Sequence, residues 1–122
     1  MGQPNKPDTT DCRPLSEALS KIGDKWTILI AMELEEGPKR FSALQRNIEG
    51  ISQRMLALTL RVLERDGLVE RSVYPTKPPS VEYALTQLGK EMAVPVRALG
   101  MWVAQNLTRI EQARLTFDAA IH

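Results

Sequence analysis

Three arginines with helical spacing are the residues of this chain whose chemistry is most readily interpreted. Arg54, Arg61 and Arg65 project from one side of a helix that turns by roughly 100° per residue. Three leucines, at positions 56, 60 and 63, fall on the opposite side. A guanidinium group presents its donors as a planar fork that pairs with phosphate oxygens and with the edge of guanine. The pattern therefore predicts a helix with a basic outer face and an apolar inner face.

Other residue types give little basis for catalysis. The single histidine is the terminal His122, and the single cysteine is Cys12. We find no cluster of metal ligands, no glycine-rich phosphate loop and no nucleophile beside an evident base. Glu33, Glu35 and Glu36 form an acidic cluster that we expect to be solvated at a helix end. We predict no enzyme, no cofactor and no metal site.

The arginine-bearing helix is predicted over residues 52–66. Ser52 is placed to accept a hydrogen bond from an amide of the first turn, and Ile51 can pack against the face beyond it. The helix should end at Asp66-Gly67, since glycine tolerates the left-handed conformation that closes a helix.

Two strands follow this helix directly. Residues 68–74 and 80–85 alternate in polarity as strands do, and residues 75–79 between them contain three prolines with Lys77 near the tip. A helix followed by such a hairpin is the layout of a winged helix. A stiff basic loop, the wing, suits a phosphate backbone or a minor groove.

The elements before this unit should form its scaffold. A first helix starts near Pro14 and ends at Gly23, and Asp24 caps a second helix whose apolar residues cover much of its circumference. Residues 39–41 can pair as a third strand, and Ser42 then caps a short helix through Ile48. The predicted fold is α+β and mainly α, with a small antiparallel sheet.

Thr86 opens the last helical region, in which Pro95 should bend the helix or mark a boundary. We expect a break near Thr108. The predicted divisions are a flexible arm at 1–11, a winged-helix domain at 12–107 and a helical extension at 108–122.

Charge is concentrated on the predicted reading elements. The net charge is +1, but residues 39–77 carry eight basic and four acidic side chains, whereas the rest of the chain has a net charge of −3. This distribution favours attraction to phosphates, with a solvated helix face as the alternative. No apolar run reaches the roughly 20 residues that cross a bilayer, and no signal peptide is evident, so we expect a soluble cytoplasmic protein without a membrane partner.

Several short motifs occur in the same order as in a known family. They are Gly23-Asp24-Lys25-Trp26-Thr27, Gly37-Pro38-Lys39-Arg40-Phe41, Gly50-Ile51-Ser52, Leu63-Glu64-Arg65-Asp66-Gly67-Leu68-Val69, Pro78-Pro79-Ser80-Val81-Glu82-Tyr83 and Leu85-Thr86. Together they resemble the HxlR-type winged helix-turn-helix transcriptional regulators of bacteria, over roughly Cys12 to Trp102. The resemblance implies a homodimer that binds double-stranded operator DNA, with repression as the commoner outcome.

The resemblance also implies residue roles. Helix 52–66 would enter the major groove, and the wing at 75–79 would meet the backbone or the minor groove. The predicted DNA-binding residues are Arg40, Ser52, Gln53, Arg54, Leu58, Arg61, Arg65, Arg71 and Lys77. Arg46 is a further candidate for phosphate. Leu58 could touch a thymine methyl group or simply pack beneath a neighbouring side chain.

The terminal helices are more apolar than the small core requires. An isologous dimer would bury Leu15, Leu19, Leu99, Trp102 and Leu107, and its reading helices about 34–36 Å apart would match a pseudo-palindromic operator. The alternative is that these residues close the monomer's own core. A further hypothesis is that a small ligand in this apolar interface controls DNA binding, near Trp26, Met32, Leu99 and Trp102. We assign no ligand site there.

Cys12 precedes a predicted helix amino terminus. The helix dipole and Arg13 favour a thiolate there, while Asp11 opposes it. Some members of the resembling family sense oxidants with a cysteine at this place, so Cys12 is a candidate redox sensor, against the alternative of an inert thiol.

The alternative to a DNA-binding regulator is a winged helix that binds proteins and no DNA. The operator sequence, the regulated genes, the sign of regulation and the signal are not encoded in these residues.

Overall fold

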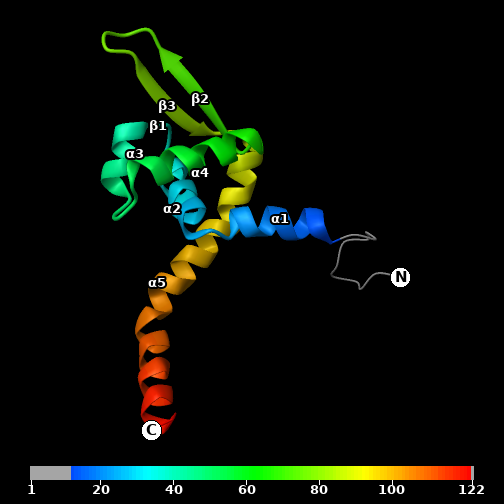
Figure 1. Ribbon diagram of the computed structural model, residues 1–122, viewed down its shortest axis with the longest axis vertical. Helices are drawn as coiled ribbons and strands as arrows, with labels where there is room; N and C mark the ends of the chain where they lie inside the picture. Colours follow the sequence, from blue (N-terminus) through cyan, green and yellow to red (C-terminus); the bar gives the residue numbers. More distant parts are fainter. Residues whose placement is uncertain (1–11, 122) are drawn as a thin grey trace.

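The computed structural model describes residues 12–121 as a small, mainly helical body from which a hairpin and the last helix project in opposite directions, while the first helix extends to one side (Figure 1). Its elements, in chain order, are α1 (Arg13–Ile22), α2 (Lys25–Glu35), β1 (Lys39–Arg40), α3 (Phe41–Asn47), α4 (Gln53–Arg65), β2 (Val69–Tyr74), β3 (Ser80–Leu85) and α5 (Gln87–Ile121). The predicted mainly helical winged helix-turn-helix with a small antiparallel sheet is therefore confirmed. The predicted arm at 1–11 lies outside the described residues.

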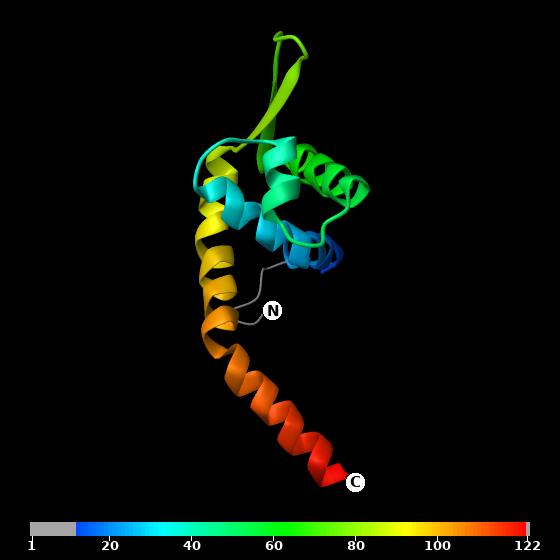
Figure 2. The same ribbon diagram turned by 90° about the vertical axis from the view of Figure 1, so that its left-hand side faces the viewer.

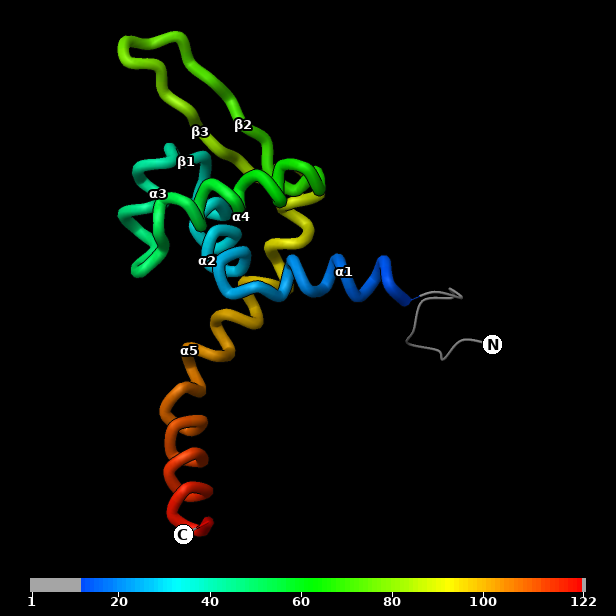
Figure 3. The backbone as a smooth tube through the Cα atoms, in the orientation of Figure 1, coloured from blue at the N-terminus to red at the C-terminus, as the bar shows by residue number. Residues whose placement is uncertain are grey.

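The sheet has three antiparallel strands in the order β1-β3-β2. β3 is the central strand, since Tyr83 is opposite Lys39 on one side and Arg71 on the other. β1 is only two residues long, so β2 and β3 extend beyond it as a two-stranded hairpin. This hairpin carries the predicted wing loop 75–79 at its tip, and hairpin and loop together form the wing, which rises from the body above α3 and α4 (Figures 1 and 3).

A single core lies between α2, α3, α4, the base of the sheet and the first turns of α5. Its fully buried large side chains are Ile30, Leu44, Leu56, Leu60 and Leu63. The three leucines of α4 are those placed on one face by their spacing. α4 is therefore fixed to the body by its inner face and leaves its other face in solvent.

Two of the three predicted helix N-caps are confirmed. The Asp24 carboxylate accepts a hydrogen bond from the Trp26 amide at 3.0 Å, and Ser52 Oγ accepts one from the Met55 amide at 3.0 Å. The cap predicted at Ser42 is wrong, because α3 already begins at Phe41 with Arg40 as its N-cap. The Phe41 ring packs against Tyr83, with ring centroids 6.5 Å apart, so the helix starts directly where strand pairing ends.

α5 is one uninterrupted helix of 35 residues, so the break expected near Thr108 is wrong. Residues 101–121 contain no glycine or proline, and the Asn106 side chain donates to the Trp102 carbonyl at 2.8 Å, within the helix. Pro95 marks no boundary, and the axis changes direction beyond it, in the orange part of the ribbon (Figure 2). The division into 12–107 and 108–122 stays a prediction.

Candidate nucleic-acid interface

The outward face of α4 presents the predicted set of side chains. Gln53, Arg54, Arg61 and Arg65 are exposed, and Leu58 is 48% exposed. Because Ser52 caps the helix by bonding to the Met55 amide, the first turn and Arg54 within it have a defined position. Arg54 lies at the leading end of α4, where base contacts of a recognition helix concentrate.

The cations around α4 and the wing are free to meet an external anion. Within residues 12–121, no acidic group lies within ion-pair distance of the side chains of Arg40, Arg46, Arg54, Arg61, Arg65, Arg71 or Lys77. Lys39 and Arg97, by contrast, are paired with glutamates. A paired cation must lose its partner before it can bind phosphate, so the unpaired set is the one suited to DNA.

Three of these arginines come together where α4 meets the wing. Arg61, Arg65 and Arg71 line a hollow of about 620 Å³, together with Leu58, Val62 and Glu64. Strand alternation places Arg71 on the face of β2 that also carries Val69, which is buried. The wing strand and the recognition helix thus present guanidinium groups to one concave surface.

Leu58 lies between two hollows. Besides the one just described, it lines a smaller hollow of about 260 Å³ that is also formed by Met55 and Thr59 on α4 and by residues of the α1–α2 corner. Met55 is 39% exposed, and the sequence analysis did not single it out. Its position next to Leu56, about 100° around the helix and on the side of Leu58, is the signal that could have identified it.

The wing is held in shape by its own side chains. Thr76 Oγ1 donates to the Pro78 carbonyl at 2.8 Å, and the Tyr74 hydroxyl donates to Glu82 at 3.1 Å. This hydrogen bond to Glu82 is the main reason that the pKa of Tyr74 lies above its usual value. Lys77 therefore sits on a loop that is braced on both sides.

The sequence predicted that the acidic cluster of Glu33, Glu35 and Glu36 would be solvated. In the structure all three glutamates form ion pairs. Lys39 Nζ lies 2.8 Å from Glu33 Oε1 and 2.7 Å from Glu36 Oε1, and Arg97 lies 3.3 Å from Glu35. Burial raises the pKa of Glu33, but hydrogen bonds from Lys39 and Asn47 and the Lys39 charge outweigh it, so the pKa lies below its usual value. The hydrogen bonds to Glu33 and Glu36 are the main cause that raises the pKa of Lys39.

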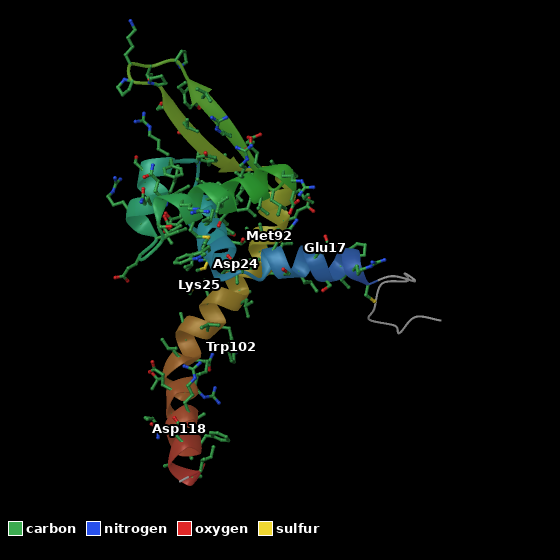
Figure 4. The ribbon with its side chains drawn as sticks, in the orientation of Figure 1. Glu17, Asp24, Lys25, Met92, Trp102 and Asp118 are labelled. Carbon is green, nitrogen blue, oxygen red and sulfur yellow. The ribbon has the colours of Figure 1, made fainter. Side chains whose placement is uncertain are left out.

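The apolar residues predicted for a dimer contact are left uncovered by the chain's own core. Leu15, Leu19, Leu99, Trp102 and Leu107 are all exposed, with Leu19 at 59% and Trp102 at 55%. α1 has no buried residue at all. Figure 4 shows Trp102 on the part of α5 that leaves the body, well away from α4. Cys12 is an exposed free thiol at the N-cap of α1.

Two classes of site are missing from the described part of the chain. No three histidine, cysteine, aspartate or glutamate side chains come together there as metal ligands. Among the helices of residues 12–121, none is both long enough and apolar enough to cross a membrane. The exposed side chains described above are the unpaired cations of α4 and the wing and the apolar side chains of α1 and α5.

Comparison with known proteins agrees with this geometry. The family model described as HxlR-like helix-turn-helix matches residues 21–111. The HTH-type transcriptional regulator YtfH of Escherichia coli K12 is 44% identical over 101 residues, which cover 83% of this chain and 80% of that protein. Among solved structures, the putative transcriptional regulator ytfH from Salmonella typhimurium superposes with a TM-score of 0.82 at 38% identity, over 89% of this chain and 98% of that one. The redox regulator HypR in its oxidized form superposes with a TM-score of 0.70 at 41% identity, over 76% and 96% of the two chains.

Proposed function

Because the chain belongs to the HxlR-like helix-turn-helix family and is a DNA-binding transcriptional regulator, we propose that it acts in the cytoplasm as a homodimeric repressor on a pseudo-palindromic operator. The observation that carries the proposal is the set of exposed, unpaired cations on α4 and the wing. The compared relatives and structures are transcriptional regulators, which gives no support to a protein-interaction module without DNA.

In this proposal α4 lies in the major groove with its amino-terminal half against the bases. Arg54 makes base contacts, helped by Gln53 and by apolar contact from Leu58. The hollow lined by Arg61, Arg65 and Arg71 takes the phosphate backbone beside that groove, because three guanidinium groups converge there. Lys77 reaches the adjacent backbone or minor groove from the wing, and Arg40 contributes a phosphate contact from the start of α3.

The homodimer is supported by what the single chain leaves exposed. Leu15 and Leu19 on α1, and Leu99, Trp102 and Leu107 on α5, are large apolar side chains that the body does not cover. Exposed large apolar side chains in such number are typical of a protein interface. A two-fold axis that packs α1 and α5 of two copies together would bury all five side chains. The dimer would then present two α4 helices to the DNA.

Binding to duplex DNA tests the proposal. Fragments that flank the chain's own coding region are titrated across a salt series with the wild-type protein, with Arg54→Ala and with Arg114→Ala as a matched control. Arg114 is an exposed arginine near the far end of α5. We expect selective binding that weakens with salt, a loss of about tenfold or more in Arg54→Ala from a missing base contact, and no change in the control. Absence of duplex affinity at low salt would contradict the proposal.

Regulation through Cys12 is a second proposal, favoured by its exposed thiol and by the similarity to a redox regulator whose oxidized form is known. Two such thiols, one from each copy, can form a disulfide when an oxidant removes two electrons and two protons. Oxidant should then change operator binding in the wild type and leave Cys12→Ser unaffected. An equal response in both proteins would exclude Cys12 as the sensor.

A further inference from the structure

One carboxylate oxygen joins three elements of the body: α2, β1 and α3. Glu33 Oε1, on α2, accepts hydrogen bonds from Lys39 Nζ at 2.8 Å and from Asn47 Nδ2 at 3.0 Å. Lys39 belongs to β1, and Asn47 is the last residue of α3. These three groups were not connected by any sequence pattern, since Glu33 and Asn47 are fourteen positions apart.

Glu33 starts from a fixed backbone. Its neighbours along α2, Ile30 and Leu34, are buried in the core, so the helix cannot shift without disturbing that packing. The Glu33 side chain is only 23% exposed, whereas that of Glu36, the other partner of Lys39, is 69% exposed. Glu33 therefore has the more restricted position of the two and is the better anchor.

Asn47 leads directly into the turn before the recognition helix. The turn, residues 48–52, has Ile48 and Ile51 in the core, but Glu49 and Gly50 are exposed and Gly50 has a φ of +85°. The bond from Asn47 to Glu33 is a side-chain hydrogen bond that ties the start of this turn to α2. The turn is also held by the buried Ile48 and Ile51 and by the bond from the Ile51 amide to the Ile48 carbonyl at 3.3 Å, and the Asn47 bond adds a side-chain link to α2 at its start.

We infer that Glu33 is a positioning residue for DNA recognition: by holding Asn47 it steadies the turn at 48–52, and with it the amino-terminal end of α4, while the core leucines hold the rest of that helix. The inference rests on the proposed function, because it concerns how α4 meets its operator. Lys39 serves as the counter-ion of this carboxylate and, being bonded to two glutamates, makes no phosphate contact of its own. Glu33 touches no DNA, since it acts through Asn47.

Matched alanine substitutions separate this role from simple loss of an ion pair. Glu33→Ala removes the acceptor for Asn47 and one partner of Lys39. Glu36→Ala also removes one partner of Lys39 but leaves the Asn47 bond intact. Asn47→Ala removes the bond from its other end, at an exposed residue whose loss should not prevent folding. The double variant Glu33→Ala with Asn47→Ala asks whether the two residues act as one unit.

Two measurements on the folded, full-length proteins decide the matter. Hydrogen exchange of the backbone amides of residues 48–52 should be faster in Glu33→Ala and in Asn47→Ala, and unchanged in Glu36→Ala. Operator affinity should fall roughly three- to tenfold in the same two variants, as for the loss of one ordinary hydrogen bond, with no further loss in the double variant. The salt dependence of binding should stay as in the wild type, because no phosphate contact is removed.

The opposite results would overturn the inference. If Glu36→Ala matched Glu33→Ala in both measurements, the effect would come from the Lys39 charge and not from Asn47. If neither Glu33→Ala nor Asn47→Ala changed exchange in the turn, Glu33 would not position it. A wild-type chain that bound no duplex would defeat the proposed function, while the exchange comparison would still decide whether Glu33 sets the turn.

Discussion

Replacing Gly89 by alanine should destabilise the protein, although alanine is the better helix former. Gly89 lies in the first turn of α5, where its amide donates to Thr86 Oγ1 at 3.0 Å. A Cβ atom at this position would lie 2.0 Å from the Leu68 carbonyl oxygen and 3.1 Å from Leu85 Cδ2. The oxygen belongs to the backbone and cannot rotate away, so the start of α5 would have to move off the α4–β2 junction.

The size of the effect follows from what that movement breaks. Thr86 bonds to the junction twice, through its amide to the Leu68 carbonyl at 3.1 Å and through Oγ1 to the Gly67 carbonyl at 2.6 Å. Overpacking costs about 1–3 kcal/mol and two lost hydrogen bonds about 1 kcal/mol each, against a gain in helix propensity of about 1 kcal/mol. The net loss in the free energy of unfolding should be about 2–4 kcal/mol.

Urea denaturation followed by circular dichroism, at one protein concentration, measures this difference. Gly100→Ala is the matched control, because it makes the same change in the same helix. Its Cβ would lie 2.7 Å from Met32 Sδ, the end of a flexible side chain that can move, so we expect a change of under about 1 kcal/mol. A Gly89→Ala protein as stable as the wild type would refute the close approach of α5 to Leu68.

Three further predictions follow from individual contacts. Ser52→Ala should lower the free energy of unfolding by about 1 kcal/mol through loss of the α4 cap, whereas Ser42→Ala, which removes no cap, should change it little in the same urea assay. The lowered pKa of Glu33 means that its carboxylate, facing Lys39, Glu36 and Asn47, contributes stability above the usual value of 4.5, and this contribution is lost as the pH falls through the lowered native pKa. Acid should therefore destabilise the wild type more than Glu33→Gln, as urea midpoints at neutral and acidic pH would show, and equal sensitivity would contradict that pKa shift. Trp102→Ala should weaken the proposed dimer by about 2 kcal/mol or more, seen as a shift toward monomer in sedimentation at micromolar concentration.

Features that depend on near neighbours in the sequence were predictable. The buried face of α4 follows from the spacing of Leu56, Leu60 and Leu63, and the caps at Asp24 and Ser52 follow from residue type beside a helix start. The outward position of the α4 arginines has the same origin, because it is the complement of the buried face.

Features that depend on distant parts of the chain were not predictable. α3 begins at Phe41 because of Tyr83, which is more than forty positions away, and this contact overrode the capping preference of Ser42. The bond between Glu33 and Asn47 exists only because α2 and the end of α3 lie side by side. The convergence of Arg71 with Arg61 and Arg65 likewise requires the chain to turn at Gly67 so that the base of β2 lies beside the end of α4.

The length of α5 gives the molecule a geometric property that its core does not suggest. The helix crosses α2 at Gly100, beside Met32, and then continues to Ile121. At a rise of 1.5 Å per residue this outer part is an arm about 30 Å long. A tilt of about 10° at the crossing moves the far end of such an arm by about 5 Å. In the proposed dimer, the packing of α5 on α2 at this crossing would therefore set the angle between each arm and its body, and with it the placement of the two α4 helices.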